Sequence, residues 1–315
     1  MNMIYGHIKI EFILNTTIGI KNPSFLIPFL CYVGFKIKYN LLKMNQLYST
    51  LNNGVQMPLL GLGVYDMYQK TAEHAIETAI EIGYRLFDTA SMYRNEAEVG
   101  NAIRNSGIPR QDVFITTKVN NTDHGYEETL KAFDISAQKI DCQYIDLYLI
   151  HWGIRFKRKD TWRALEKLYH EGRVRAIGVC NYAEPFLAEM QDYAQITPVV
   201  NQVEFSPYLY LKDLHAICQS KQILLQAWSP LVRGTRMHDP KLLQLAQKYG
   251  KSPAQILIRW GLDLGISTIP KSVTAHRLKE NFDVFDFKIA PSDMAWMGKW
   301  HENLRVFGED PMLYF

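Results

Sequence analysis

Four residues in the middle of the chain carry side chains that could together move a proton: Asp88, Tyr93, Lys118 and His151. A tyrosine ordinarily has a pKa of about 10, so Tyr93 is a poor acid near neutral pH unless its surroundings lower that value. An ammonium at Lys118 would do so by stabilising the phenolate, while Asp88 would hold the ammonium in place. His151 could hydrogen-bond a substrate oxygen in either protonation state. Proton donation to an oxygen, with hydride from another species, describes carbonyl reduction.

Asp88, Lys118 and His151 each follow an apolar run, as do Asn181 and Gln202, which predicts that each lies where a buried strand ends in a polar loop. Tyr93 lies in the loop that follows Asp88. A single polar residue at a strand end is more often a terminator that bonds to the loop backbone. Several neighbouring strands that each deliver a different ionisable or hydrogen-bonding group are harder to explain in that way. The elements that position them therefore decide between the two interpretations.

From residue 59 onward, short apolar runs alternate with segments of helical periodicity. Eight strands are expected, at residues 59–64, 86–88, 113–118, 145–150, 174–180, 199–203, 223–228 and 267–269. Helices are expected between and after them, at residues 71–82, 96–104, 127–139, 161–169, 185–193, 211–220, 241–249, 253–264 and 275–282. This alternation predicts a parallel sheet covered by helices.

Eight strand–helix units in this length favour a (β/α)8 TIM barrel over an open doubly wound sheet. No Gly-x-Gly-x-x-Gly motif follows the first strand, which argues further against a Rossmann fold. Asn52-Asn53-Gly54 separates two strand-like stretches and predicts an N-terminal β-hairpin. In such a barrel the carboxyl ends of the strands converge, so Asp88, Lys118 and His151 are expected to meet on one face.

Composition excludes several other classes of function. The chain has 315 residues, with 35 basic against 32 acidic residues and a formal charge of +3. No Lys/Arg block suited to nucleic acid or an anionic membrane is present. The four cysteines form no Cys-x-x-Cys pair, and the histidines show no metal-ligand spacing. We expect a cytoplasmic protein, monomeric, with reduced thiols and no metal site.

Residues 1–43 differ from the remainder in their abundance of Ile, Phe, Asn, Lys and Tyr. Their apolar stretch at residues 25–35 is shorter than the roughly 20 residues of a membrane-spanning helix, and no cleavage pattern follows it. We expect translation to begin at Met44, with residues 1–43 a disordered or spurious extension and residues 44–315 one barrel domain. The intact mass of protein from the native host tests this.

Five motifs in the right order resemble those of the aldo/keto reductases. They read Gly-Tyr-Arg-Leu-Phe-Asp-Thr-Ala-Ser-Met-Tyr (83–93), Ile-Thr-Thr-Lys (115–118), Asp-Leu-Tyr-Leu-Ile-His-Trp (146–152), Gly-Val-Cys-Asn-Tyr (178–182) and Ile-Pro-Lys-Ser (269–272). The resemblance implies NADPH-dependent reduction of aldehydes or ketones, with Asp88, Tyr93, Lys118 and His151 as the catalytic tetrad. The short loops of this chain are similar to those of the microbial members of the family that act on diketogluconate, glyoxal and methylglyoxal.

The resemblance also implies which residues bind NADPH and line the substrate pocket. The nicotinamide would contact Asn181, Gln202 and Trp228. The pyrophosphate would contact Ser229 and Leu231, and Gly63 would also belong to the cofactor site. The adenosine 2′-phosphate would be held by Lys271, Ser272 and Arg277, because two cations and a hydroxyl suit a dianion. Glu280 and Asn281 would contact the adenine, and Tyr65, Trp152 and Phe307 would wall the substrate.

Three positions depart from the family pattern. Cys180 replaces a serine beside the nicotinamide, which exchanges a good donor for a weak one and would make the site sensitive to oxidation if its thiol pKa were low. Gly153 replaces a proline, which is expected to loosen that loop. Ser206 replaces a histidine, with no evident physical consequence.

Two other functions are compatible with these motifs. Some barrels of this type are NADPH-binding regulatory or redox-sensing subunits with little turnover. A barrel aldolase would instead use Lys118 to form a Schiff base, although the neighbouring Asp88 and Tyr93 favour a charged lysine.

Overall fold

The structure is a computed structural model that describes residues 47–314, which lie within one compact unit. Within these residues, eight parallel strands form one sheet in the order β10-β9-β8-β7-β6-β5-β4-β3. Their bounds are β3 (Leu62–Gly63), β4 (Leu86–Asp88), β5 (Phe114–Val119), β6 (Ile145–Ile150), β7 (Val174–Cys180), β8 (Val200–Glu204), β9 (Leu224–Trp228) and β10 (Ser267–Thr268). The expectation for residues 1–43 lies outside the described part of the chain.

Backbone contacts between the two edges of this sheet close it into a barrel. Leu60 forms a parallel bridge with Thr268, and the Gly61 N–H donates to the Thr268 carbonyl at 2.9 Å. Residues 59–61, expected to begin the first strand, therefore pair with the last one. The predicted (β/α)8 barrel is confirmed.

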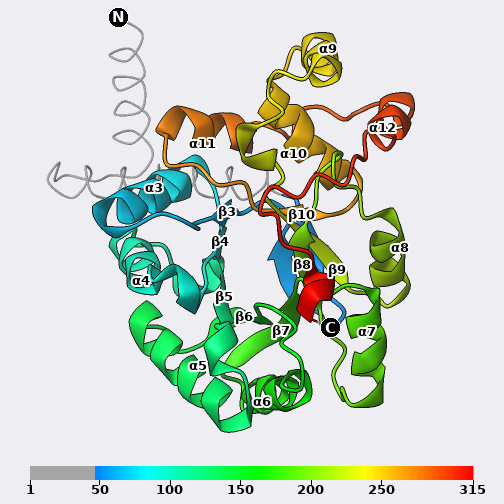
Figure 1. Ribbon diagram of the computed structural model, residues 1–315. Helices are drawn as coiled ribbons and strands as arrows, with labels where there is room; N and C mark the ends of the chain where they lie inside the picture. Colours follow the sequence, from blue (N-terminus) through cyan, green and yellow to red (C-terminus); the bar gives the residue numbers. More distant parts are fainter. Residues whose placement is uncertain (1–46, 315) are drawn as a thin grey trace, which may run out of the picture. The chain divides into compact units, whose positions relative to one another are not determined.

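The helices surround the barrel, as Figure 1 shows. Their bounds are α3 (Gln69–Ile82), α4 (Glu96–Asn105), α5 (Tyr126–Ile140), α6 (Arg158–His170), α7 (Glu184–Glu189), α8 (Lys212–Ser220), α9 (Pro240–Tyr249), α10 (Pro253–Asp263), α11 (Ala275–Phe282) and α12 (Pro291–Met297). Shorter 3-10 turns lie at Ser91–Tyr93 (η2), Arg110–Asp112 (η3), Asn121–Asp123 (η4), Met190–Asp192 (η5), Val232–Gly234 (η6) and Pro311–Tyr314 (η7). The apolar residues at helical spacing in α3 are the ones it buries, which explains why periodicity located it. Helix α12 was not predicted, because its seven residues are too few to establish a period.

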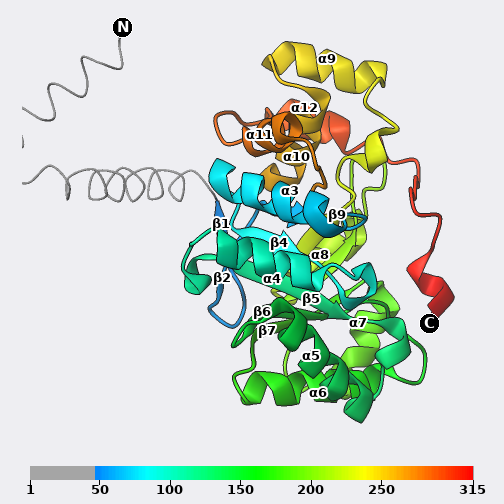
Figure 2. The same ribbon diagram turned by 90° about the vertical axis from the view of Figure 1, so that its left-hand side faces the viewer.

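The predicted hairpin is present as β1 (Tyr48–Thr50) and β2 (Gln56–Pro58), which pair antiparallel. Gly54 supplies the turn at φ 85°, a left-handed conformation that suits glycine. The buried Leu51 and Met57 share an apolar cluster with Leu86 and Phe114, the first residues of β4 and β5. The hairpin therefore seals the amino-terminal end of the barrel, and Figure 2 shows it opposite the C-terminal tail.

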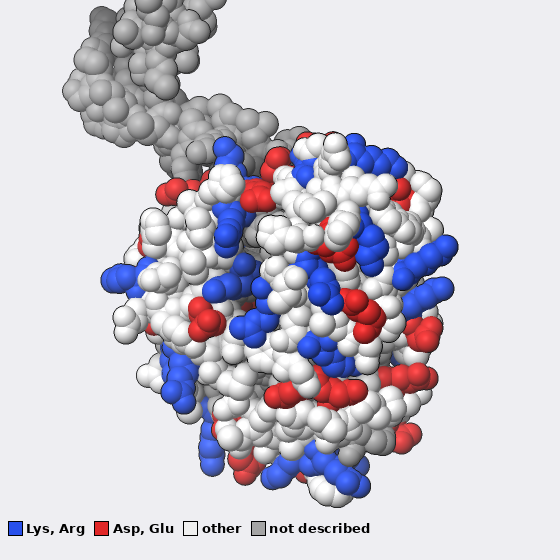
Figure 3. Space-filling view, turned by 45° about the horizontal axis from the view of Figure 1, so that its top comes forward, with Lys and Arg blue, Asp and Glu red and all other residues white. Residues whose placement is uncertain are grey.

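The described helices and one face of the surface bear on the expectations from composition. No helix within residues 47–314 combines the length and the apolar character needed to cross one. On the face in Figure 3, acidic and basic side chains are interspersed rather than gathered into a field of one sign.

Gly100 in α4 allows close packing against α5 and predicts a stability effect. A Cβ at this position would lie 2.1 Å from the carbonyl oxygen of Ile140, which is backbone and cannot swing away. We expect Gly100→Ala to lower the free energy of unfolding by about 2 kcal/mol, since overpacking outweighs the gain in helix propensity. Urea unfolding measures this. Gly298→Ala, whose new Cβ would make only ordinary contacts at 3.4 Å or more, is the control; equal stability of the two variants would contradict the prediction.

Candidate active site

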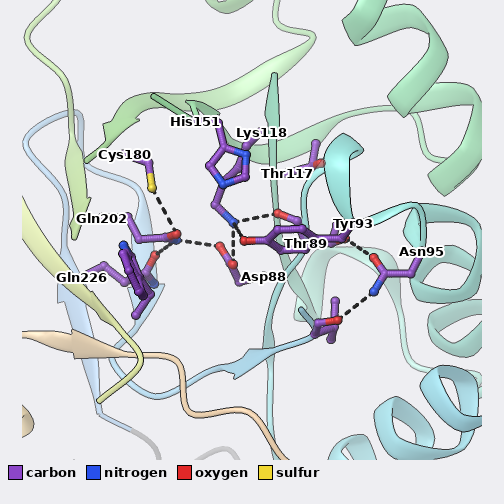
Figure 4. A network of polar contacts seen from close by, with 12 residues as sticks. Asp88, Thr89, Tyr93, Asn95, Thr117, Lys118, His151, Cys180, Gln202 and Gln226 are labelled. Atoms are coloured by element: carbon purple, nitrogen blue, oxygen red, sulfur yellow. Dashed lines mark hydrogen bonds and ion pairs between the residues drawn. The ribbon is translucent and has the colours of Figure 1, made fainter. Parts of the chain in front are cut away.

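A buried ion pair lies at the centre of the site. The Lys118 ammonium has no exposed surface and donates to Asp88 Oδ1 at 2.6 Å and to the Thr89 carbonyl at 2.9 Å. Burial alone would lower the pKa of Lys118, but the combined interactions with Asp88, Tyr93 and Cys180 outweigh it, and the pKa is raised above its usual value. Burial raises the pKa of Asp88, and the ammonium opposes that rise. Lys118 therefore stays charged near neutral pH. Figure 4 shows its ammonium beside the Asp88 carboxylate.

Tyr93, at the end of η2, places its hydroxyl 3.5 Å from the Lys118 ammonium. The ammonium also lies 4.9 Å from the centre of the phenol ring. Burial raises the pKa of Tyr93, and the opposing effect of Lys118 does not overcome it. The expected net lowering of this pKa is therefore not found. Tyr93 is therefore protonated near neutral pH, and the Lys118 ammonium lies close enough to stabilise a phenolate at this position.

His151 completes the group from the end of β6. Its ring centre lies 5.7 Å from that of Tyr93 in an edge-on arrangement. Burial, with lesser effects of Lys118 and His124, holds the pKa of His151 well below its usual range. The imidazole is therefore neutral near pH 7, whereas the sequence was compatible with either protonation state.

A row of buried polar side chains crosses the barrel beside the ion pair. The strand register aligns Cys180, Gln202, Gln226 and Ser267 across β7 to β10. Gln202 Nε2 donates to Asp88 Oδ2 and to Gln226 Oε1, each at 2.7 Å, and Gln226 Nε2 donates to Ser267 Oγ at 3.0 Å. Both amide protons of Gln202 are thus occupied. Within the described chain, Gln202 Oε1 accepts only a long 3.6 Å bond from Cys180. This oxygen is therefore the atom available to a ligand.

Asn181 and Trp228 hold each other next to this row. The Trp228 indole N–H donates to Asn181 Oδ1 at 3.0 Å, and Asn181 Nδ2 donates to the His151 carbonyl at 3.1 Å. Asn181 has φ 60°, a left-handed backbone that turns its side chain back toward β6. The indole is therefore fixed at the cavity wall.

A cavity of about 870 Å³ opens at the carboxyl ends of the strands. It is lined by every predicted site residue except Lys118, which lies buried behind its wall; the lining residues are Gly63, Tyr65, Asp88, Tyr93, His151, Trp152, Asn181, Gln202, Trp228, Ser229, Leu231, Lys271, Ser272, Arg277, Glu280, Asn281 and Phe307. Such a volume is within the usual range for ligand pockets. The structure thus brings the predicted catalytic, cofactor and substrate residues together around one space.

One end of the cavity is basic. Lys271 and Arg277 are exposed, and within residues 47–314 neither forms an ion pair with a carboxylate. The buried Ser272 lies between them in sequence, at the approach to α11. Two unneutralised cations and a hydroxyl form a site that can bind a phosphate.

The other end is aromatic and is closed by the C-terminal tail. The Phe307 ring centre lies 5.6 Å from that of Tyr65 and 5.7 Å from that of Trp228. Glu204 Oε1 accepts a 2.6 Å hydrogen bond from the Val306 N–H, which anchors the tail beside Phe307. Further along the tail, Tyr314 contacts Trp152, with ring centres 5.0 Å apart.

Arg233 and Asn95 are two site residues that the sequence did not indicate. Arg233 lines the cavity and lies 5.2 Å above the Phe307 ring, and its φ of 50° reflects a tight loop after β9. A cation just after the predicted pyrophosphate residues was the available signal. Asn95 is fully buried two residues after Tyr93, and nothing in sequence alone distinguished it from a helix cap.

The three departures from the family pattern can now be assessed. The Cys180 thiol is 1% exposed, and burial raises its pKa, so the condition for oxidation sensitivity is not met. The Gly153 carbonyl accepts from Arg158 at 2.9 Å, and a Cβ at this position would lie 3.2 Å from the Phe186 ring; the expected loosening of this loop stays a prediction. Ser206 Oγ accepts the Leu209 N–H at 3.2 Å and stabilises a turn.

Other chemistries fit this site less well. Schiff-base formation needs an accessible neutral amine, whereas Lys118 is buried, charged and bonded to Asp88. Within the described residues, no group of three or more His, Cys, Asp or Glu side chains is arranged to hold a metal ion.

Comparison with known proteins gives consistent matches. The model of the aldo/keto reductase family matches residues 60–301. An uncharacterised oxidoreductase of Bacillus subtilis, YtbE, is 51% identical over 84% of this chain and 95% of its own length, and a glyoxal reductase of the same organism is 48% identical over 83% and 95%. The crystal structure of a Bombyx mori aldo-keto reductase in complex with NADP is similar with a TM-score of 0.78, at 35% identity over 82% of this chain and 94% of that one.

His124, buried behind His151, predicts how stability depends on pH. Burial, then Lys157, lowers its pKa to about 4, and neither ring nitrogen has a hydrogen-bond partner within the described chain. Between pH 6.5 and 4 the unfolded chain therefore binds a proton that the folded protein does not. The free energy of unfolding should fall by about 3 kcal/mol through this one group as pH falls across that window.

Urea unfolding of the wild type and His124→Gln at pH 7 and pH 4.5 tests this. The variant should lose less stability on acidification than the wild type, whereas His74→Gln, at an exposed position, should behave as the wild type does. Equal losses in all three proteins would contradict the prediction.

Proposed function

This chain belongs to the aldo/keto reductase family, and we propose that it reduces aldehydes or ketones to alcohols with NADPH, using Tyr93 as the general acid. The observation that carries the proposal is the Tyr93 hydroxyl at the cavity wall, 3.5 Å from a buried ammonium that Asp88 holds charged. A phenol in that position is protonated before the reaction and stabilised as phenolate after it.

The residues around the cavity fit NADPH. Lys271, Ser272 and Arg277 would hold the 2′-phosphate, and Glu280 with Asn281 the adenine. Ser229 and Leu231 would approach the pyrophosphate, near Arg233. At the nicotinamide, the free Oε1 of Gln202 would accept from the carboxamide NH₂, alongside Asn181 and Trp228, and Gly63 would allow close approach.

Each catalytic residue then has a separate task. When bound, NADPH supplies the hydride that adds to the carbonyl carbon. Tyr93 donates its proton to the carbonyl oxygen, which completes the alcohol. Lys118 stabilises the phenolate that remains, and Asp88 keeps Lys118 charged and aimed. The neutral His151 orients the carbonyl oxygen through a hydrogen bond without competing as the acid.

The substrate class is proposed from the pocket wall and the relatives. Tyr65, Trp152 and Phe307 would surround a small carbonyl compound, and the name of the B. subtilis glyoxal reductase points to small dicarbonyls. Small dicarbonyls or keto-sugars are therefore the proposed substrates. We further propose a cytoplasmic monomer, because one chain supplies the whole cavity and Cys142, Cys180 and Cys218 are free thiols.

Consumption of NADPH with methylglyoxal, glyoxal, aromatic aldehydes and keto-sugars tests the function, together with the variant Tyr93→Phe. We expect Tyr93→Phe to bind NADPH as the wild type does and to lose about 10²–10⁴ in kcat, the usual contribution of a general acid. Tyr68→Phe, at an exposed tyrosine outside the cavity, is the control. Retained turnover in Tyr93→Phe would refute the acid role, and tight NADPH binding with negligible wild-type turnover would favour the regulatory or redox-sensing alternative.

Arg277 predicts cofactor preference. Loss of one charge-assisted contact to the 2′-phosphate should raise the Kd for NADPH about tenfold in Arg277→Ala and leave the Kd for NADH nearly unchanged. Fluorescence titration measures both constants. Lys279→Ala removes an exposed cation from the same helix outside the cavity and should change neither; an equal loss for both cofactors in Arg277→Ala would exclude this contact.

A further inference from the structure

Asn95 is a fully buried amide whose bonds all lead to the loops around Tyr93. Its Nδ2 donates to the carbonyls of Val64 and Met67, at 2.7 and 2.9 Å, and its Oδ1 accepts from Thr89 Oγ1 at 2.6 Å. Figure 4 shows the amide between these loops, beside Tyr93. Asn95 thus joins three segments: the loop after β3, the end of β4, and the turn that carries Tyr93.

An ordinary helix-capping role does not account for this side chain. Asn95 precedes α4 at the N-cap position, where asparagine commonly accepts a hydrogen bond from the first turn. Here the side chain makes no capping bond, and its amide is instead engaged by the three tertiary partners. Its contribution is therefore to loop geometry rather than to the helix terminus.

The loops that Asn95 joins carry two residues of the proposed reaction. Val64 and Met67 flank Tyr65, whose ring centre lies 5.0 Å from that of Tyr93. Between Tyr93 and Asn95, Arg94 has φ 58° and ψ 29°, a left-handed conformation that an arginine adopts only when its surroundings enforce it. The buried Asn95 amide, two positions after Tyr93, anchors that turn.

We propose that Asn95 is a positioning residue for carbonyl reduction, which holds the Tyr93 hydroxyl against Lys118 and the Tyr65 wall against Tyr93. The inference rests on the proposed function. Removing the amide leaves the carbonyls of Val64 and Met67 without these donors and frees the turn at Arg94. A shift of the phenol by about 1 Å is enough to cost up to about 100-fold in rate.

The test compares Asn95→Ala with Asn101→Ala, which removes the same side chain from within α4, the helix that Asn95 precedes, at a site outside the cavity. For Asn95→Ala we expect kcat to fall about tenfold to 100-fold, with the Kd for NADPH within about twofold of the wild type. The isotope effect on kcat with NADPH deuterated at the transferred position should rise, because a misplaced acid slows the chemical step. Loss of folded protein would instead lower kcat and leave the isotope effect unchanged.

Thr89→Val gives a milder second test, since it removes only the 2.6 Å bond to Asn95 and keeps the backbone carbonyl that Lys118 uses. We expect Thr89→Val to lower kcat and to raise the isotope effect, as we expect of Asn95→Ala. If Asn95→Ala does not fold, Thr89→Val tests the positioning role by itself. Unchanged kcat and isotope effect in the folded Asn95 or Thr89 variant, or equal changes in Asn101→Ala, would overturn the positioning role while the proposed function stands. Absence of wild-type turnover would overturn both.

Discussion

The charge on Lys118 is the constraint around which the site is built, because an ammonium with no exposed surface is costly unless its hydrogen bonds are supplied by the protein. Asp88 supplies the countercharge, and the Thr89 carbonyl and the Tyr93 hydroxyl supply the other acceptors. The second Asp88 oxygen must then be satisfied as well, which Gln202 does. Each polar partner thus requires the next, and the network continues from Gln202 on β8 to Gln226 on β9 and Ser267 on β10.

A closed barrel is well suited to such a network. Adjacent parallel strands present side chains in register, so residues from β7 to β10 form one continuous row inside the sheet. The hairpin fills the opposite end with apolar side chains such as Leu51 and Met57. The polar interior is therefore confined to the end where the loops and the tail form the cavity, in agreement with the usual location of barrel active sites.

Sequence reasoning predicted the parts of this site that depend on strand ends. Asp88, Lys118 and His151 were located because apolar runs stop at them and parallel strands converge. The pKa of Tyr93 was expected to fall and instead rises, because the extent of burial depends on how segments remote in sequence pack. Asn95 was missed for a similar reason, since its partners near Val64 lie some thirty positions earlier in the chain. The loop at Gly153 has a partner that the family pattern did not indicate, since Arg158 donates to the Gly153 carbonyl.

The orientation of the Gln202 amide determines which hydrogen-bonding groups this part of the cavity would accept. With both amide protons committed to Asp88 and Gln226, the side chain presents lone pairs alone. A ring substituent that donates a hydrogen bond is attracted there, whereas a carboxylate would set oxygen against oxygen. The barrel would in this way distinguish an amidated cofactor from its deamidated acid, and the distinction would depend on Asp88, whose carboxylate can only accept and therefore takes the NH₂ group of Gln202.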